Sequence, residues 1–265
     1  MLTNYHTHST FCDGKDTVDE MVRHAIKLGF DAIGFSGHGR TETHLHSMRD
    51  HDAYCAAVLA AREAYRDRIQ VYLGVEEDMT QPVEREKFEY IIGSVHYICK
   101  DGVRYPVDSG IEHQQRCLEA FGGDSRAMAK RFFETAAGYI LERKPDIVGH
   151  FDLLTKYDEQ NGNLFLGDRE YLAIAREYLG KALASDCIFE VNTGAMARGL
   201  RTRPYPCEEL LHFMKQQGAK LILSSDCHDK HLLDAYFDET KVLLRQVGFR
   251  ELYVLYDGAF RPTAL

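Results

Sequence analysis

Histidine and carboxylate residues recur along this chain in one context, at or just after the end of a short apolar run. The residues that share this context are His6, His8, His38, Glu76, His96, His150, Asp226 and His228, and Asp13 follows closely behind the first pair. Neutral imidazole and carboxylate together suit Zn²⁺, Fe²⁺ or Mn²⁺ rather than Ca²⁺ or a thiolate-bound ion. The pattern therefore predicts a site for divalent transition metals.

The spacing within these motifs has a physical reason. His6 and His8 are two residues apart, so on a strand both imidazoles point to the same side and can chelate one cation. A carboxylate such as Glu76 can bridge two cations through its two oxygens. Sites of this kind often hold two ions about 3.5–4 Å apart with a hydroxide between them.

Each of these residues alone would be weak evidence. A lone histidine in a strand is more often a hydrogen-bonded core residue, and a lone glutamate at a strand end is usually solvated. The Asp13-Gly14 pair is equally a turn signal. The repetition of the same context along the chain is what favours one shared site.

The apolar runs alternate with amphipathic stretches, which predicts an α/β protein with a parallel sheet. The expected strands are 2–6, 31–38, 69–76, 90–96, 145–150, 187–192 and 219–226, and the expected helices are 16–28, 50–66, 124–143, 168–184, 206–217 and 232–247. Seven strands with intervening helices favour a barrel over an open sheet. The carboxyl ends of barrel strands open on one face, so the strand-end residues are expected to converge there.

Two further segments lie outside this alternation of strands and helices. The long connection from 97 to 144 should carry an inserted loop or hairpin near the pocket. The run 251–256 is expected to be an extra strand or a C-terminal cap. Because no linker, repeat or low-complexity tract is found, residues 1–265 are interpreted as a single domain.

The overall composition narrows the classes of function. The chain has 265 residues, 45% of them hydrophobic, and a formal net charge of −9, which argues against nucleic acid as a partner. No apolar run is long enough to span a membrane, and the N-terminus shows no secretion signal, so a cytoplasmic location is expected. Seven scattered cysteines without a CxxC pair argue against a disulfide framework or a thiolate zinc site. The oligomeric state is left open.

The motifs together resemble the polymerase and histidinol phosphatase (PHP) superfamily, and its histidinol-phosphate phosphatase branch most closely. The resemblance runs from residue 6 to 228 and depends on the order of short motifs. These motifs are His6-Thr-His8-Ser with Asp13-Gly14, Gly37-His38-Gly39, Gly74-Val-Glu76, Ser94-Val-His96-Tyr97, Gly149-His150-Phe-Asp152, Glu190-Val-Asn-Thr-Gly194 with Gly199 and Tyr205-Pro206, and Ser225-Asp226-Cys-His228.

This resemblance implies a distorted seven-stranded (βα)7 TIM-like barrel with three divalent transition-metal ions, Zn, Fe or Mn, at the carboxyl ends of its strands. One ion would be held by His6, His8, Glu76 and Asp226, a second by Glu76, His96 and His150, and a third by Asp13, His38 and His228. Some relatives have a histidine at the position of Asp13.

The resemblance also implies a phosphomonoesterase that hydrolyses L-histidinol phosphate to L-histidinol and phosphate in histidine biosynthesis. A metal-bridging hydroxide would attack phosphorus, and Glu76, Asp226 and His228 are the predicted catalytic residues. The predicted phosphate-binding residues are Arg198, Arg201 and Arg203 in one loop, and Arg40 after His38, because guanidinium groups bind phosphate in a bidentate manner. Asp152, Glu190 and Asn192 are candidates to bind the amine and imidazole of the substrate.

Several alternatives remain open at this point. A phosphodiesterase, a nucleotide phosphatase or a phosphotyrosine phosphatase would use the same metals. A metal-dependent amidohydrolase also begins with a His-x-His strand, but the third strand here ends in Glu76 and no lysine stands at a strand end. A non-catalytic metal-binding module is the third alternative, and the full set of ligands argues against it.

Overall fold

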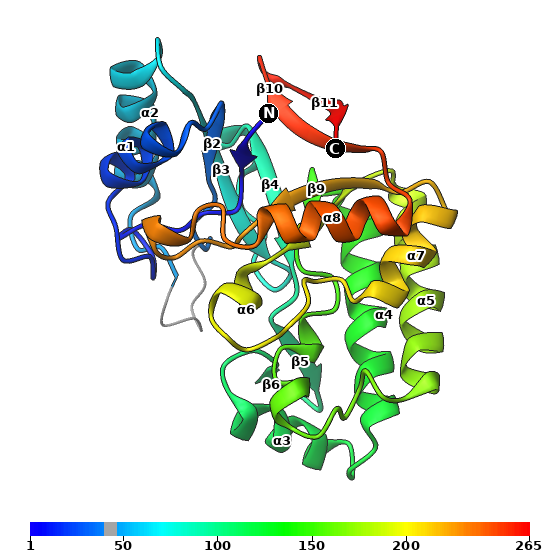
Figure 1. Ribbon diagram of the computed structural model, residues 1–265. Helices are drawn as coiled ribbons and strands as arrows, with labels where there is room; N and C mark the ends of the chain where they lie inside the picture. Colours follow the sequence, from blue (N-terminus) through cyan, green and yellow to red (C-terminus); the bar gives the residue numbers. More distant parts are fainter. Residues whose placement is uncertain (40–46) are drawn as a thin grey trace.

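Seven parallel strands form the centre of the computed structural model, which describes residues 1–39 and 47–265 (Figure 1). Their order in the sheet is β1 (Thr3–Asn4), β2 (Ala32–Phe35), β3 (Gln70–Asp78), β4 (Tyr90–Ser94), β7 (Ile147–Val148), β8 (Ile188–Asn192) and β9 (Lys220–Ser224). Every neighbouring pair in this order is parallel. All seven predicted strands are confirmed.

Backbone hydrogen bonds beyond the ends of β1 and β9 nearly close this sheet into a barrel. The amide of His8 donates to the carbonyl of Cys227 over 2.8 Å, and the amide of Cys227 donates to the carbonyl of His6 over 3.0 Å. Thr7 and Cys227 form an isolated parallel bridge at the same place. The closure brings the first and last motifs of the sequence side by side.

One hydrophobic cluster receives side chains from all seven strands and so marks the barrel interior. Its strand members are Tyr5, just after β1, and Ala32, Tyr72, Tyr90, Ile92, Ile147, Ile188 and Ile222. Alternate residues of a strand share a face, so Glu76 follows Tyr72 and Glu190 follows Ile188 into the interior. The interior therefore changes from apolar to ionisable toward the carboxyl ends of the strands.

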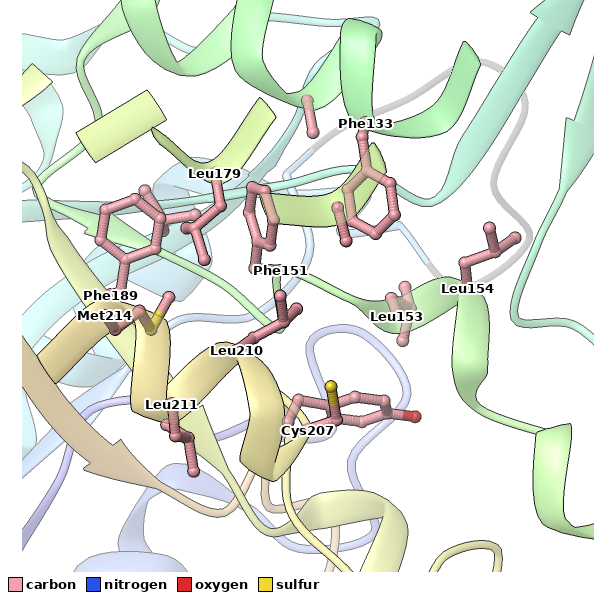
Figure 2. Packing of buried hydrophobic residues seen from close by; sticks show 14 of the residues in the cluster. Phe133, Phe151, Leu153, Leu154, Leu179, Phe189, Cys207, Leu210, Leu211 and Met214 are labelled. Atoms are coloured by element: carbon pink, nitrogen blue, oxygen red, sulfur yellow. The ribbon is translucent and has the colours of Figure 1, made fainter. Parts of the chain in front are cut away.

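Helices pack around the strands and cover the outer face of the barrel. They are α1 (Val18–Leu28), α2 (His51–Tyr65), α4 (Ser125–Arg143), α5 (Arg169–Ala182), α7 (Glu208–Gln216) and α8 (Phe237–Val247), with the short α6 (Gly194–Ala197) after β8. Figure 2 shows Phe133 of α4, Leu179 of α5 and Leu210 of α7 around Phe151, whose ring lies 5.3 Å from that of Phe133 between centroids. This packing fixes the segment that follows β7.

Several helices begin at a side-chain cap. Thr17 caps α1 in a capping box with Glu20, and Asp124 and Asp168 accept backbone N–H groups at the starts of α4 and α5. Such caps satisfy amide groups that have no partner inside the helix. The predicted helix positions are confirmed within a few residues. No helix among the described ranges has the length and hydrophobicity needed to cross a bilayer.

The two segments outside the regular pattern lie at opposite ends of the barrel (Figure 1). The 97–144 connection contains the antiparallel hairpin of β5 (Tyr97–Lys100) and β6 (Val103–Pro106), followed by α3 (Ile111–Ala120). The run 251–256 is β10 (Glu251–Tyr256), which pairs with β11 (Ala259–Ala264). Val254 and Leu255 of β10 join the interior cluster, so the hairpin caps the barrel at its amino end.

Candidate metal centre

The carboxylate of Glu76 lies at the middle of the predicted ligand cluster, at the carboxyl end of β3. Its Oε1 is 3.3 Å from His96 Nε2 and 3.2 Å from His150 Nε2. Its Oε2 is 3.4 Å from His6 Nε2 and 3.6 Å from His8 Nε2. Oε2 also lies 2.8 Å from His38 Nδ1. The two oxygens therefore face different sets of histidines, which is the arrangement that a bridging carboxylate requires.

Asp226 completes one side of this arrangement. Its Oδ1 is 3.6 Å from His6 Nε2 and 3.2 Å from His8 Nε2. His6 and His8 thus direct the same nitrogen toward the same two carboxylates, as expected for residues two apart on an extended segment. Asp226 itself has a left-handed backbone with φ of 46°, a conformation that surrounding contacts must hold in place for a non-glycine residue.

Asp13 joins a third group of donors at the edge of the cluster. Its Oδ2 lies 3.2 Å from His228 Nε2 and 3.6 Å from His38 Nε2. A tight turn brings it there, since the amide of Gly14 donates to the carbonyl of Ser9 and a Cβ at Gly14 would lie 2.5 Å from backbone atoms of His8 and Ser9. The Asp13-Gly14 pair is therefore both a turn and part of the cluster.

All nine predicted ligands lie in four overlapping groups in which one donor atom per residue falls within 4.8 Å of the others. These groups are His8, Asp13, His38 and His228; His6, Glu76 and His150; His6, His8 and Asp226; and His38, Glu76 and His96. Residues spread over most of the chain are thereby gathered at one end of the barrel.

Two observations test whether metal ions fit this cluster. The buried atoms His6 Nε2 and His8 Nε2 have no hydrogen-bond partner among the described residues, and such atoms usually find one. The cluster also favours positive charge. Burial opposes protonation of His6, but Glu190 and Glu76 raise the pKa of its imidazole to about 10. Burial likewise opposes ionisation of Glu76, yet His6 and His38 hold its pKa well below the ordinary value. Divalent cations suit both properties.

The cluster forms the floor of a cavity of about 360 Å³. Besides predicted ligands, its described lining comprises Asp108, Ser109, Leu153, Lys156 and Arg198. Arg198 and Lys156 bring positive charge to the walls, and Asp108 brings a carboxylate whose Oδ1 is buried without a partner in the described part of the chain. A small anionic molecule with a cationic group would meet complementary charges here.

Of the predicted phosphate-binding arginines, the structure places only Arg198 in this cavity. Arg201 and Arg203 line a separate hollow of about 490 Å³. The buried Arg201 donates to Thr155 Oγ1 and stacks on the ring of Tyr205 at 4.4 Å. The chain turns away after α6 because Gly199 has a left-handed φ of 69°, so the three arginines do not share a site. Arg40 lies outside the described residues.

The residues expected to bind the amine and imidazole of the substrate have other partners. Asp152 is fully buried and accepts from the amide of Cys207 at the start of α7 over 2.9 Å. Glu190 and Asn192 are also buried and bond to each other. None of the three appears in the cavity lining, so this expectation was wrong in its geometry.

Sequence reasoning missed Asp108, Ser109 and Lys156. Asp108 and Ser109 follow the β5–β6 hairpin, and Lys156 follows a short 3₁₀ turn (Leu153–Thr155) after β7. Lys156 Nζ donates to the carbonyl of Asp108 over 2.9 Å and lies 3.3 Å from its Oδ2. These positions show no strand-end pattern. For Asp108 and Ser109 the available signal was the prediction that the 97–144 insertion lies near the pocket, and for Lys156 the sequence offered no signal.

Comparison with known proteins agrees with this fold. Residues 4–194 match the model of the PHP domain. A Schizosaccharomyces pombe protein named probable histidinol-phosphatase is 26% identical, over 97% of this chain and 90% of that protein. A Deinococcus radiodurans protein of the same name is 25% identical, over 94% and 95%.

One solved structure has the same fold as this chain along nearly the whole length of both. It is the histidinol phosphate phosphatase of Lactococcus lactis complexed with zinc, L-histidinol and phosphate. The TM-score is 0.71 at 19% identity, with 98% of each chain covered. Because the PHP domain model matches more than half of the chain, this protein belongs to the PHP family.

Proposed function

We propose that this protein is a metal-dependent phosphomonoesterase that hydrolyses L-histidinol phosphate to L-histidinol and phosphate. The observation that carries the proposal is the pair of Glu76 oxygens, which face different sets of imidazoles, on the floor of a cavity with basic walls. The full-length similarity to relatives named histidinol-phosphatase supports the choice of substrate.

Three ions would be held by the nine clustered residues. His6, His8, Glu76 and Asp226 would bind the first ion, Glu76, His96 and His150 the second, and Asp13, His38 and His228 the third. Imidazole and carboxylate donors suit Zn, Fe or Mn. Such ions neutralise the charge of a phosphate ester and activate water for attack on phosphorus.

The protein's own groups would bind and orient the substrate. The Arg198 guanidinium reaches the cavity wall beside Asp226 and would donate to phosphate oxygens, where planar N–H donors are most effective. Lys156 would add a second positive charge. Asp226 and His228, which also line the cavity, are our candidates for moving a proton to or from the reacting groups.

Asp108 would bind the cationic amine of the substrate. Burial opposes ionisation of Asp108, but Lys156, His96 and His150 lower its pKa to about 2, so the group is a carboxylate at neutral pH. Its buried Oδ1 has no partner among the residues described. An ammonium group would supply that partner, and a charged pair of this kind is stronger than a neutral hydrogen bond.

A phosphate-release assay on metal-replete protein tests this function. The panel contains L-histidinol phosphate, O-phosphotyrosine, AMP and bis-p-nitrophenyl phosphate, compared by kcat/KM, with release of p-nitrophenolate as the readout for the diester, whose hydrolysis frees no inorganic phosphate. We expect L-histidinol phosphate to exceed every other substrate by at least about 100-fold, because a site built for polar groups strongly rejects substrates that lack them. A higher value for the diester, nucleotide or phosphotyrosine would assign the protein to one of the alternative hydrolases.

A further inference from the structure

Glu190 is a fully buried carboxylate beneath the predicted metal ligands. It lies on β8, two residues beyond Ile188, and both side chains belong to the barrel interior. It is not part of the cavity lining and cannot reach a substrate. A buried carboxylate is costly unless its oxygens are well bonded, so its contacts indicate its role.

Four donors converge on the two oxygens of Glu190. Oε1 lies 2.6 Å from His6 Nδ1 and 2.6 Å from Ser224 Oγ. Oε2 accepts from the backbone amide of His150 over 2.8 Å and from Asn192 Nδ2 over 2.9 Å. Two of the four donors thus belong to predicted metal ligands, His6 after β1 and His150 after β7.

The contact with His6 determines which nitrogen of that ring faces the cluster. When Nδ1 donates its proton to Glu190, the lone pair remains on Nε2. That nitrogen lies 3.4 Å from Glu76 Oε2 and 3.6 Å from Asp226 Oδ1. Carboxylates that hold the far nitrogen of a ligand histidine fix its tautomer and orientation and raise its basicity.

The contact with His150 acts on the backbone rather than on the ring. It holds the start of the segment after β7, from which the His150 Nε2 reaches Glu76 Oε1 at 3.2 Å. We propose that Glu190 is a positioning residue of the metal centre, which orients His6 and His150 toward opposite oxygens of Glu76. This inference rests on the metal centre that is part of the proposed function.

A glutamine cannot replace Glu190 in this role. All four neighbours donate, and a carboxylate offers only acceptors, whereas an amide replaces one acceptor oxygen with an N–H donor. Whichever way the amide is turned, two donors on one side lose their acceptor. Glu190→Gln therefore changes the hydrogen bonding of a ligand histidine while nearly conserving volume.

A matched control is provided by Asp158. This carboxylate is also buried, but it accepts from the backbone amides of Phe165 and Leu166, over 2.9 and 2.7 Å, away from the imidazole cluster. Asp158→Asn makes the same change from carboxylate to amide. A milder variant is Ser224→Ala, which removes one donor to the oxygen that binds His6.

The experiment measures zinc affinity by competition with a chromophoric chelator, together with the visible spectrum of the cobalt-substituted protein. We expect Glu190→Gln to weaken zinc binding by about 10–100-fold and to alter the cobalt spectrum. Ser224→Ala should weaken binding less, and Asp158→Asn should match wild type in both measurements. Thermal unfolding of the metal-free variants separates these effects from loss of fold.

Each outcome decides a different point. Wild-type zinc affinity and spectrum in folded Glu190→Gln would overturn the inference, as would an equal loss in Asp158→Asn. If Glu190→Gln does not fold, Ser224→Ala decides: weaker zinc binding supports the inference and wild-type binding contradicts it. Absence of zinc binding in the wild type would instead refute the metal centre of the proposed function.

Discussion

Arg198 holds Asp226 at two points. Its Nη2 donates to Asp226 Oδ2 over 2.9 Å, and its Nη1 donates to the Asp226 carbonyl over 3.1 Å. Burial opposes ionisation of Asp226, but Arg198 and His6 hold its pKa well below the ordinary value. The guanidinium therefore supports the left-handed backbone of a predicted ligand while it also lines the cavity.

Replacing this arginine should impair phosphate binding. We expect Arg198→Gln to lower kcat/KM for L-histidinol phosphate by about 10–100-fold, since hydrogen bonds to charged groups contribute about 1.5–3 kcal/mol. Steady-state kinetics with metal content measured on the same sample checks this. Arg203→Gln is the control, because Arg203 lines the separate hollow. An equal loss in both variants would contradict the assignment.

Glu76→Gln should remove most activity and leave the fold intact. An amide cannot supply two anionic oxygens to the two sets of imidazoles that face the Glu76 side chain. We expect the amount of bound metal to fall and kcat/KM to decrease by more than about 100-fold. This exceeds the typical effect of losing a residue that hydrogen-bonds to a metal ligand without binding the metal itself. Circular dichroism, elemental analysis and phosphate release on one preparation check this. Near-normal turnover with full metal content would refute the bridging role.

The neighbouring Glu77 should behave in the opposite way. Its carboxylate is fully buried on the other face of β3 and bonds to Arg143 and Tyr139, each over 2.7 Å. Glu77→Gln breaks a buried ion pair and should lower the free energy of unfolding by about 3 kcal/mol. Denaturant unfolding measures the loss. The metal content of the folded protein should stay at the wild-type level, and a drop equal to that of Glu76→Gln would contradict this separation of roles.

Asp108 should control selectivity for a cationic substrate. A matched pair, O-phosphoethanolamine and ethyl phosphate, differs by one ammonium group. We expect wild type to prefer the first, and Asp108→Asn to reduce that preference by about 10-fold or more. Similar losses on both substrates would show that Asp108 acts through Lys156, its ion-pair partner, rather than through the amine.

The strands were predictable because apolar runs indicate them. The ligand cluster was predictable because its histidines and carboxylates stand at the ends of those runs. Apolar runs such as 187–192 and 219–226 must be buried in a parallel sheet, and parallel closure brings their carboxyl ends together. The direction of individual loop side chains was not predictable. Arg198 and Arg201 are three residues apart, yet they line different cavities because the chain turns at Gly199, which has a left-handed backbone. Glu190 looked like a substrate contact because strand register alone does not reveal its depth beneath the cavity floor.

The most direct measurement combines elemental analysis with phosphate release on one purified sample. The proposed metal centre predicts more than one transition-metal ion per chain, loss of L-histidinol phosphate hydrolysis when a chelator removes the metal, and recovery when Zn, Fe or Mn is restored. Full activity in protein shown to contain no transition metal would contradict it.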